Sequence, residues 1–554
     1  GNIVCRSDID PTASYEIDYF TASNGLADGA YNSNDYYTFT PGDGQCAPLN
    51  PFGYYSTSAE ARDFITAQVE DELTIEQTVV SLFASGEFDW LDSVLDGSLG
   101  YASGFEYREE SSDERLDELR LGVLPQGTPH TAGQNVNDVY PYINAFLGID
   151  NVKQYNTGGE YDVMDAFVEV RLPIFEDREF AHEFSIDAAL RYADYSTLGG
   201  ATTWKLGFAY SPIEDINFRG TVSEAVRAPN ISELFDPRLP ITVSATADPC
   251  DISQIDSGTG NREANCIANL QAAGVALSDI VDGDGNYAWQ NPLTGRFTGT
   301  SGGNPDLEVE TAETVTFGVV IQPSMVEGLI VTVDYWDVTI EDAILAVGSA
   351  DILQGCLDSP NFPSLGFCEQ FSRRSDGGLN DLTTGQINFA RQEAEGIDLS
   401  ISYGWDVGAN EFNATLVGTR QKTLNNFFNP LDLSDVNPEV EEVQVPKTSG
   451  NFELSWSREN FSVAVQTTYQ SRQSYREIEE TLGLNGNQQL FGANGGFFDE
   501  VFIHDINASY QFDESLTVFG GVNNLADEEP FVTQTAWPVN PRGRTVFLGI
   551  SYQM

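Results

Sequence analysis

Stretches of about ten residues in which apolar and polar side chains alternate recur along the chain, and the last reaches its C-terminal end. Within residues 545–553, every second position from Val546 to Tyr552 is apolar. The positions between them are polar or small, except for Phe547. A period of two residues is the signature of a β-strand. Repeated strands with one apolar and one polar face are how a β-barrel crosses a membrane. The pattern therefore predicts an all-β protein, a transmembrane antiparallel β-barrel with an apolar outside and a polar bore.

The alternation predicts fifteen strands. They lie at 72–88, 96–110, 161–174, 183–196, 202–212, 216–226, 308–322, 328–341, 387–404, 410–423, 447–458, 460–474, 500–512, 516–526 and 543–554. Short turns mostly alternate with long connections, which is the arrangement of an outer-membrane barrel with long extracellular loops. One short helix is predicted within 56–68, where a Ser/Thr cap precedes helically spaced apolar residues.

The number of predicted strands indicates an incomplete barrel, because single-chain bacterial barrels have even numbers of strands. If the C-terminal strand ends on the short-turn side, counting back makes the strand at 72–88 begin at a long loop. We therefore expect residues 1–71 to form an extracellular loop segment and residues 72–554 a partial transmembrane β-barrel. The strands before them would come from a segment outside this chain.

The charge of the chain excludes some partners. Lys+Arg number 26 against 85 Asp+Glu, a formal net charge of −59. Few cations are available to neutralise phosphates, which argues against nucleic acid and against a basic surface docked on anionic lipid. An aromatic content of 12% and a hydrophobic content of 41% favour a folded chain over disorder. The acidic surface is either simply solvated or adapted to divalent cations or salty water.

The six cysteines form three pairs that are close in sequence and lie outside the predicted strands. They are Cys5 and Cys46, Cys250 and Cys266, and Cys356 and Cys368. Local pairing is the simplest of the fifteen connectivities that six cysteines allow. It predicts three disulfides, each closing one extracellular loop in an oxidising space. The alternatives are free thiols or a metal site, but no C-x-x-C spacing and no neighbouring histidine supports a metal.

One long loop carries closely spaced carboxylates with glycines, which can wrap a hard cation such as Ca²⁺. Asp282, Asp284 and Asn286 are the candidate calcium ligands, with Asp279 just before them. The spacing of an EF-hand is incomplete because no glutamate follows at its twelfth position. A solvated acidic loop is the alternative.

Aromatic residues in the long loops could stack on a flat or sugar-like ligand, or pack against one another. They are Tyr54, Tyr55, Trp289, Phe427, Phe428, Tyr475, Phe497, Phe498, Phe531 and Trp537. Catalysis has little support. Three histidines occur, and no H-E-x-x-H, P-loop or G-x-S-x-G motif is present. The sequence therefore predicts a protein that is not an enzyme and has no resident cofactor apart from the Ca²⁺ considered above.

Six segments, in order, resemble the barrel of TonB-dependent outer-membrane receptors of the large proteobacterial type. They are Arg219–Pro237, Asn304–Pro323, Val333–Ile344, Glu395–Tyr403, Val522–Pro530 and Gly543–Tyr552. Upstream, the Cys5 region and Cys46–Gly53 resemble a disulfide-bearing loop of that family. The resemblance covers essentially the whole chain.

The resemblance implies a barrel of 22 strands around an N-terminal plug, of which this chain supplies the last fifteen strands. The plug and seven strands would lie outside it, and the plug would bind TonB. The expected function is uptake of a scarce small nutrient, an oligosaccharide or a metal chelate, across the cell outer membrane, with the barrel surrounded by outer-membrane lipid. The acidic net charge favours neutral saccharides over bare anionic chelates. The alternatives are a passive porin, which lacks a plug, and a secreted disulfide-stapled β-rich surface protein.

Overall fold

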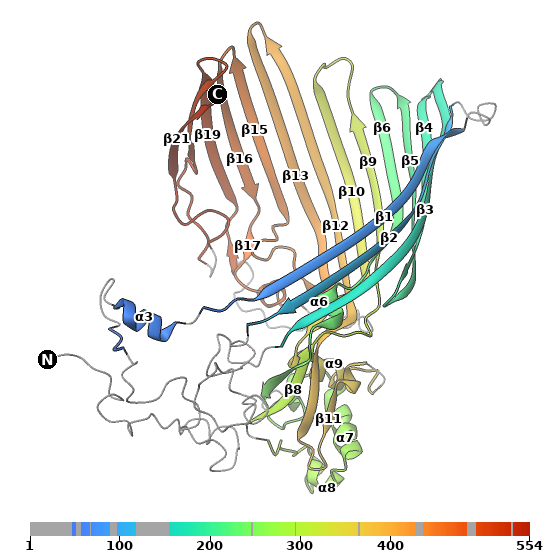
Figure 1. The fold of residues 1–554 in the computed structure, drawn as a ribbon, viewed down its shortest axis with the longest axis vertical. Coiled ribbons are helices and arrows are strands. Elements are labelled where there is room, and N and C mark those ends of the chain that lie inside the picture. The colour runs from blue at the N-terminus through green and yellow to red at the C-terminus, as the bar shows by residue number, and fades with distance from the viewer. Residues whose placement is uncertain are drawn as a thin grey trace, which may run out of the picture.

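One large antiparallel sheet dominates the protein, as a computed structural model shows (Figure 1). The structure describes residues 47–50, 57–66, 68–88, 97–117, 155–244, 248–293, 295–363, 366–427, 436–484, 495–532 and 536–553. Within that part of the chain, no helix is both long and apolar enough to cross a membrane.

The long strands confirm the predicted pattern, because each of the fifteen predicted strands overlaps one of them. They are β1 (Glu72–Phe88), β2 (Leu99–Arg115), β3 (Thr157–Arg178), β4 (Ala181–Tyr195), β5 (Gly199–Ile213), β6 (Ile216–Arg227), β9 (Glu310–Ile321), β10 (Leu329–Val347), β12 (Leu379–Val407), β13 (Asn410–Phe427), β15 (Thr448–Arg458), β16 (Phe461–Gln470), β19 (Val501–Gln511), β20 (Leu516–Asn523) and β21 (Thr545–Tyr552). Each pairs with the next in chain order. Among the described residues, β1 pairs only with β2, and β21 only with β20.

The sheet has an apolar face and a polar face because side chains alternate along every strand. Residues directly opposite each other on paired strands lie on the same face, so the register joins apolar positions into rows. Leu82 lies opposite Phe105, and Leu190 lies between Val168 and Trp204. These apolar side chains are largely exposed, as lipid-facing groups are. We call this face the outer face and the opposite face the inner face.

Aromatic side chains gather on the outer face next to the short turns. The rings of Tyr403 and Trp405 stack with centroids 4.8 Å apart, and those of Trp405 and Phe412 at 5.1 Å. Trp456 and Phe461 meet edge to face beside the next short turn. Amphipathic rings of this kind favour the boundary between lipid and water. They mark one border of the apolar belt.

The opposite end of the sheet carries a compact folded unit, which we call the cap and define as residues 239–302 and 349–387 (Figure 1). Its elements are β7 (Leu239–Ser244), η4 (Ile255–Ser257), α7 (Arg262–Ala273), α8 (Leu277–Ile280), β8 (Arg296–Gly302), α9 (Ser349–Leu357), η5 (Gly366–Glu369), β11 (Phe371–Arg373) and the start of β12. Buried side chains such as Leu270, Ile280, Leu353 and Leu382 form its core. The chain's C-terminal end lies at the other end of the sheet.

Shorter elements occupy the remaining connections. They are α3 (Ala59–Ile65), α6 (Ile231–Phe235), β14 (Val436–Pro438), β17 (Gln473–Ser474), α10 (Ile478–Leu482) and β18 (Phe497–Phe498). The helix predicted within 56–68 is confirmed as α3, whose N-cap Ser58 accepts a hydrogen bond from the Ala61 N–H. Asn230 and Glu233 form a capping box on α6.

Candidate functional site

The inner face carries paired charges in place of an apolar core. The Arg219 guanidinium donates to both carboxylate oxygens of Asp334, at 2.7 and 2.8 Å. A Cβ at Gly318 would lie 1.9 Å from Asp334 Oδ1, so a glycine is needed for this carboxylate to lie flat against the strand. On the next strands Thr419 donates to Asp398 at 2.7 Å. These groups form a polar surface suited to a water-filled or plug-filled bore.

Charged side chains also tie the long-loop ends of the strands together. Arg227, the last residue of β6, pairs with Glu233 of α6 at 3.0 Å and with Glu310 at the start of β9. Glu310 also accepts a hydrogen bond from the Ile344 N–H at 2.6 Å. One arginine therefore fixes the end of β6 to the helix and strand that follow it. The pairing of Arg227 with Glu233 gives the stretch from Arg227 to Phe235 a structural role at the end of β6.

A buried ion pair lies at the centre of the cap. Arg373 donates to both carboxylate oxygens of Asp248, at 2.7 and 2.8 Å, and the two side chains are 1% and 0% exposed. The guanidinium also donates to the Gly377 carbonyl at 2.8 Å and lies over the Trp289 ring. A buried bidentate pair is tolerated only when its other donors are satisfied, as they are in this site. It joins segments 125 residues apart.

Two disulfides staple the cap, Cys250–Cys266 and Cys356–Cys368, with S–S distances of 2.03 and 2.09 Å. Both are the local pairings predicted from the sequence. A second ion pair, between Arg262 of α7 and Asp358 after α9, links the two stapled segments. The predicted pair of Cys5 and Cys46 lies outside the described residues. The two disulfides and this ion pair therefore hold the segments of the cap together.

We predict that replacing Cys250 and Cys266 by serine destabilises the cap by about 3 kcal/mol, the entropic stabilisation expected for a loop of this size. Limited proteolysis of the full-length protein, used to monitor unfolding of the cap, would measure the change. Heat-modifiable electrophoretic mobility should stay unchanged, because the sheet does not depend on this bond. A variant cap as stable as the wild type would contradict the prediction.

The acidic loop forms a self-contained turn in the structure. Asp282 Oδ1 accepts hydrogen bonds from the backbone N–H groups of Asp284 at 3.0 Å and Asn286 at 2.8 Å. The Asn286 amide donates to Asp282 as well, at 3.2 Å. The Asn286 backbone N–H contributes most to lowering the pKa of Asp282. Within the described residues, no group of three or more His, Cys, Asp or Glu side chains is arranged to hold a metal. Calcium binding at Asp282, Asp284 and Asn286 remains a prediction from the sequence.

The loop aromatics divide into buried and partly exposed groups. Trp289, in the core of the cap, Phe427, at the end of β13, and Phe531 are buried. Phe498 stacks on Phe531 with ring centroids 4.3 Å apart, and Tyr475 meets Phe498 edge to face. Packing within the loops therefore accounts for Trp289, Tyr475, Phe498 and Phe531.

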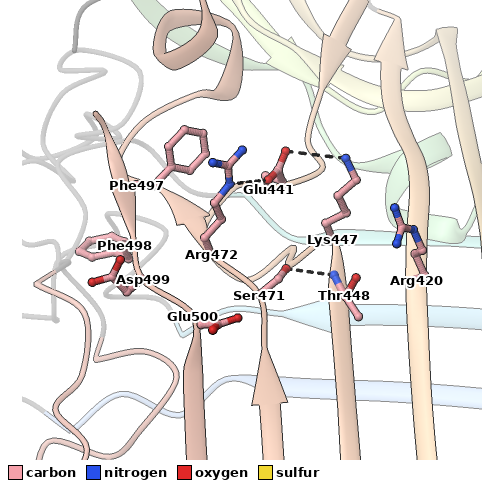
Figure 2. A pocket seen from close by; sticks show the side chains of 10 residues that line it. All are labelled: Arg420, Glu441, Lys447, Thr448, Ser471, Arg472, Phe497, Phe498, Asp499 and Glu500. Atoms are coloured by element: carbon pink, nitrogen blue, oxygen red, sulfur yellow. Dashed lines mark hydrogen bonds and ion pairs between the residues drawn. The ribbon is translucent and has the colours of Figure 1, made fainter. Parts of the chain in front are cut away.

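A pocket with a volume of about 500 Å³ opens where β13, β15, β16 and β19 reach the loop end of the sheet (Figure 2). It is lined by three basic, three acidic, two hydroxyl and two aromatic side chains: Arg420, Lys447, Arg472, Glu441, Asp499, Glu500, Thr448, Ser471, Phe497 and Phe498. Arg472 donates to Glu441 at 2.9 Å, and its guanidinium lies 4.1 Å from the centre of the Phe497 ring. The Lys447 ammonium lies 4.0 Å from Glu441.

A titratable carboxyl lies behind this pocket. Glu442 accepts a hydrogen bond from the Ile478 N–H of α10 at 2.9 Å. Burial, followed by the charges of Glu439, Glu479 and Glu477, raises the pKa of Glu442 to about 7. The carboxyl therefore exchanges its proton close to neutral pH.

We predict that the segment around Glu442 and α10 becomes less stable as the pH rises. Because the pKa of Glu442 is higher in the folded than in the unfolded chain, its stabilisation is complete below about pH 4.5 and is lost through about pH 7. Solvent screening limits the loss to about 1–2 kcal/mol. Hydrogen exchange of the α10 amides at both pH values would measure it. Glu442→Gln should remove the pH dependence, and an unchanged dependence would contradict this assignment.

A sheet of this size with an apolar outer face, a polar inner face and a folded cap at its long-loop end has the architecture of the wall of an outer-membrane β-barrel. The family model "TonB dependent receptor-like, beta-barrel" matches residues 7–525. The chain belongs to the TonB-dependent receptor family, whose members are outer-membrane transporters and not enzymes. No curated protein matches the chain significantly.

Solved structures of this family share the fold. The siderophore receptor PirA from Acinetobacter baumannii superposes with a TM-score of 0.50 at 15% identity, over 87% of this chain and 55% of that one. A mutant of the ferric enterobactin receptor PfeA from Pseudomonas aeruginosa superposes with a TM-score of 0.51 at 14% identity, over 87% and 54%. The chain thus spans little more than half the length of these structures.

The sequence did not single out the basic residues of the pocket or the ion pair of the cap. Arg420 lies on β13, Lys447 directly before β15 and Arg472 between β16 and β17, and Asp248 and Arg373 lie far apart along the chain. One signal was available, since a chain with only 26 basic residues places three of them at the loop ends of neighbouring predicted strands. Their proximity depends on the register between neighbouring strands, which the sequence pattern does not give.

Proposed function

We propose that this chain is the major part of a receptor that imports a scarce small nutrient with energy delivered by TonB. The observation that carries the proposal is a family barrel wall with a charged inner face and a cap at its extracellular end. The inner face would line the path and contact a plug, and the cap would border the entrance. The barrel itself performs no bond chemistry.

We further propose that a segment outside this chain supplies seven strands that complete the wall and a plug that fills its bore. The outermost described strands, β1 and β21, each have one edge without a partner among the described residues, which supports this reading. An open strand edge is not tolerated in lipid because its backbone groups would lack partners. Figure 1 shows β1 starting at the end of the sheet that carries the cap, which agrees with residues 1–71 forming an extracellular segment.

For the nutrient we propose a metal chelate, because the superposed structures are those of a siderophore receptor and a ferric enterobactin receptor. The formal net charge of −59 favours chelates without net negative charge. That charge also favours a second candidate, a neutral oligosaccharide.

Uptake by cells that express the complete receptor tests the function. Under iron limitation, a labelled neutral ferric chelate should enter cells with TonB and remain outside otherwise identical cells without it. Uptake that is unaffected by TonB would indicate a passive porin. Recovery of the protein without detergent would indicate a secreted protein. Import of labelled oligosaccharides and not of chelates would support the proposed receptor function but would identify an oligosaccharide as its substrate.

A further inference from the structure

The pocket of Figure 2 opens on the outer face of the wall, not into the bore. Arg420 lies directly opposite Ile397 on one side and Thr448 on the other. Ile397 is an exposed apolar residue of the outer face. Ser471 exchanges backbone and side-chain hydrogen bonds with Thr448, which extends the same row across the next strand. The row therefore faces the surroundings of the barrel.

The pocket begins where the apolar belt ends. On β13, the outer-face positions run from the aromatic Phe412 near the short turn to Arg420, with Ala414, Leu416 and Gly418 between them. The eight residue steps from Phe412 to Arg420 span roughly 26 Å along the strand, or roughly 20 Å across the membrane at the usual tilt. The long side chain of Arg420 reaches further toward the loops. Its charge thus lies at the level of the lipid head groups of the extracellular leaflet.

Neighbouring strands end their apolar rows at the same level. Tyr469 and Phe502 lie opposite each other on the outer face, with ring centroids 4.9 Å apart. The Tyr469 hydroxyl donates to Glu500 at 3.1 Å, so the ring is apolar on one side and hydrogen-bonded on the other. Such rings mark the boundary between lipid and water. The hydroxyls of Thr448 and Ser471 lie just beyond it.

The cations of the pocket are available to an anion in different degrees. Glu441 holds Arg472 at 2.9 Å and lies 4.0 Å from Lys447, while the guanidinium of the exposed Arg420 has no hydrogen bond or ion pair within the described residues. Glu500 accepts from Tyr469, and Asp499 lies on the Phe498 side of the pocket, away from Arg420 (Figure 2). Arg420 and Lys447 therefore border an open position next to two hydroxyls.

We propose that Arg420 and Lys447, with Thr448 and Ser471, bind the phosphate group of a lipid of the extracellular leaflet. A phosphate accepts charge-assisted hydrogen bonds from guanidinium, ammonium and hydroxyl donors at once. The acyl chains of the same lipid would lie along the apolar rows that lead to the pocket, which a free phosphate cannot use. The net charge of the chain argues against an extended basic membrane surface. The proposed site needs only the few basic side chains at the loop ends of neighbouring strands. The proposal does not depend on which nutrient is transported.

Native mass spectrometry of the complete receptor, purified in mild detergent and stripped of lipid, tests the proposal. The probes are diphosphoryl lipid A and the same lipid after removal of both phosphates. We expect the wild type to bind the phosphorylated probe about tenfold more tightly. The double variant Arg420→Gln/Lys447→Gln should lose this preference. A matched control, Lys205→Gln/Arg458→Gln, removes one cation from the inner face and one from the short-turn end of β15, and should keep it.

Heat-modifiable mobility verifies that each variant forms the barrel, so that loss of binding is not loss of folding. Equal preference in the wild type and the Arg420/Lys447 variant would overturn the proposal. Complete displacement of the lipid by inorganic phosphate would also overturn it, because it would indicate a site for a free anion. Loss of the preference in the control variant would assign it to overall charge and not to this pocket.

Discussion

Replacing Arg373 by methionine should destabilise the cap by about 3–5 kcal/mol, because Asp248 would keep a buried charge without its partner. The two side chains are almost completely buried, so water cannot replace the lost hydrogen bonds. The guanidinium also holds the Gly377 carbonyl and contacts the Trp289 ring, and both contacts are lost together. Hydrogen exchange of the α7 and α9 amides in the complete receptor would measure the loss.

The adjacent residue supplies the control. Arg374 pairs with Asp376 at 2.7 Å, but these side chains are 41% and 51% exposed, so Arg374→Met should cost about 0–1 kcal/mol. The double variant Arg373→Met/Asp248→Leu should recover only part of the loss. Asp248 also accepts hydrogen bonds from the Cys250 N–H and the Asn291 amide, and these donors would lose their acceptor. Equal costs for Arg373→Met and Arg374→Met would contradict the assignment.

The sheet could be predicted from the sequence because its physical cause is local. A strand between lipid and a polar bore must alternate, so each of the fifteen long strands carries its own period-two signal. The exceptions were also visible, since Phe547 interrupts the pattern of the last strand and lies opposite Gly521 on the inner face. Strand ends were predicted less well. β12 begins at Leu379, before the predicted 387, where its first residues pair with β8 and β11 of the cap.

The cap could not be predicted in the same way, because its stability comes from contacts between distant segments. Its strands are short, and β11 spans only Phe371–Arg373, which is too few residues to show a period. The two stapled segments are separated by β9 and β10, and Arg262 and Asp358 meet across that distance. Its local disulfides were predicted because their spacing is short. The ion pairs were missed because no local pattern accompanies them.

Side chains of the outer face should contact lipid and those of the inner face should not. A second substitution tests this assignment. Phe452 lies on the outer face of β15, midway between Trp456 at the short-turn border and Thr448 at the head-group level. Phe452→Arg should destabilise the folded barrel by about 2–4 kcal/mol, the cost of an arginine near the middle of a bilayer. Urea-induced unfolding from lipid vesicles, followed by heat-modifiable mobility, would measure it in the complete receptor.

Two variants on the same strand separate the effects of side and depth. Glu453 lies on the inner face opposite Thr415 and Gln466, so Glu453→Arg should cost less than about 0.5 kcal/mol despite a larger change in charge. Thr448→Arg lies on the outer face at the head-group level and should cost about 0–1 kcal/mol. Phe452 and Thr448 lie on the same face of the same strand and differ in their depth in the membrane. A smaller loss of stability at Thr448 than at Phe452 would therefore reflect the more polar surroundings at the head-group level. If Glu453→Arg were costlier than Phe452→Arg, the two faces would be exchanged, and the lipid site on the outer face would fall with them.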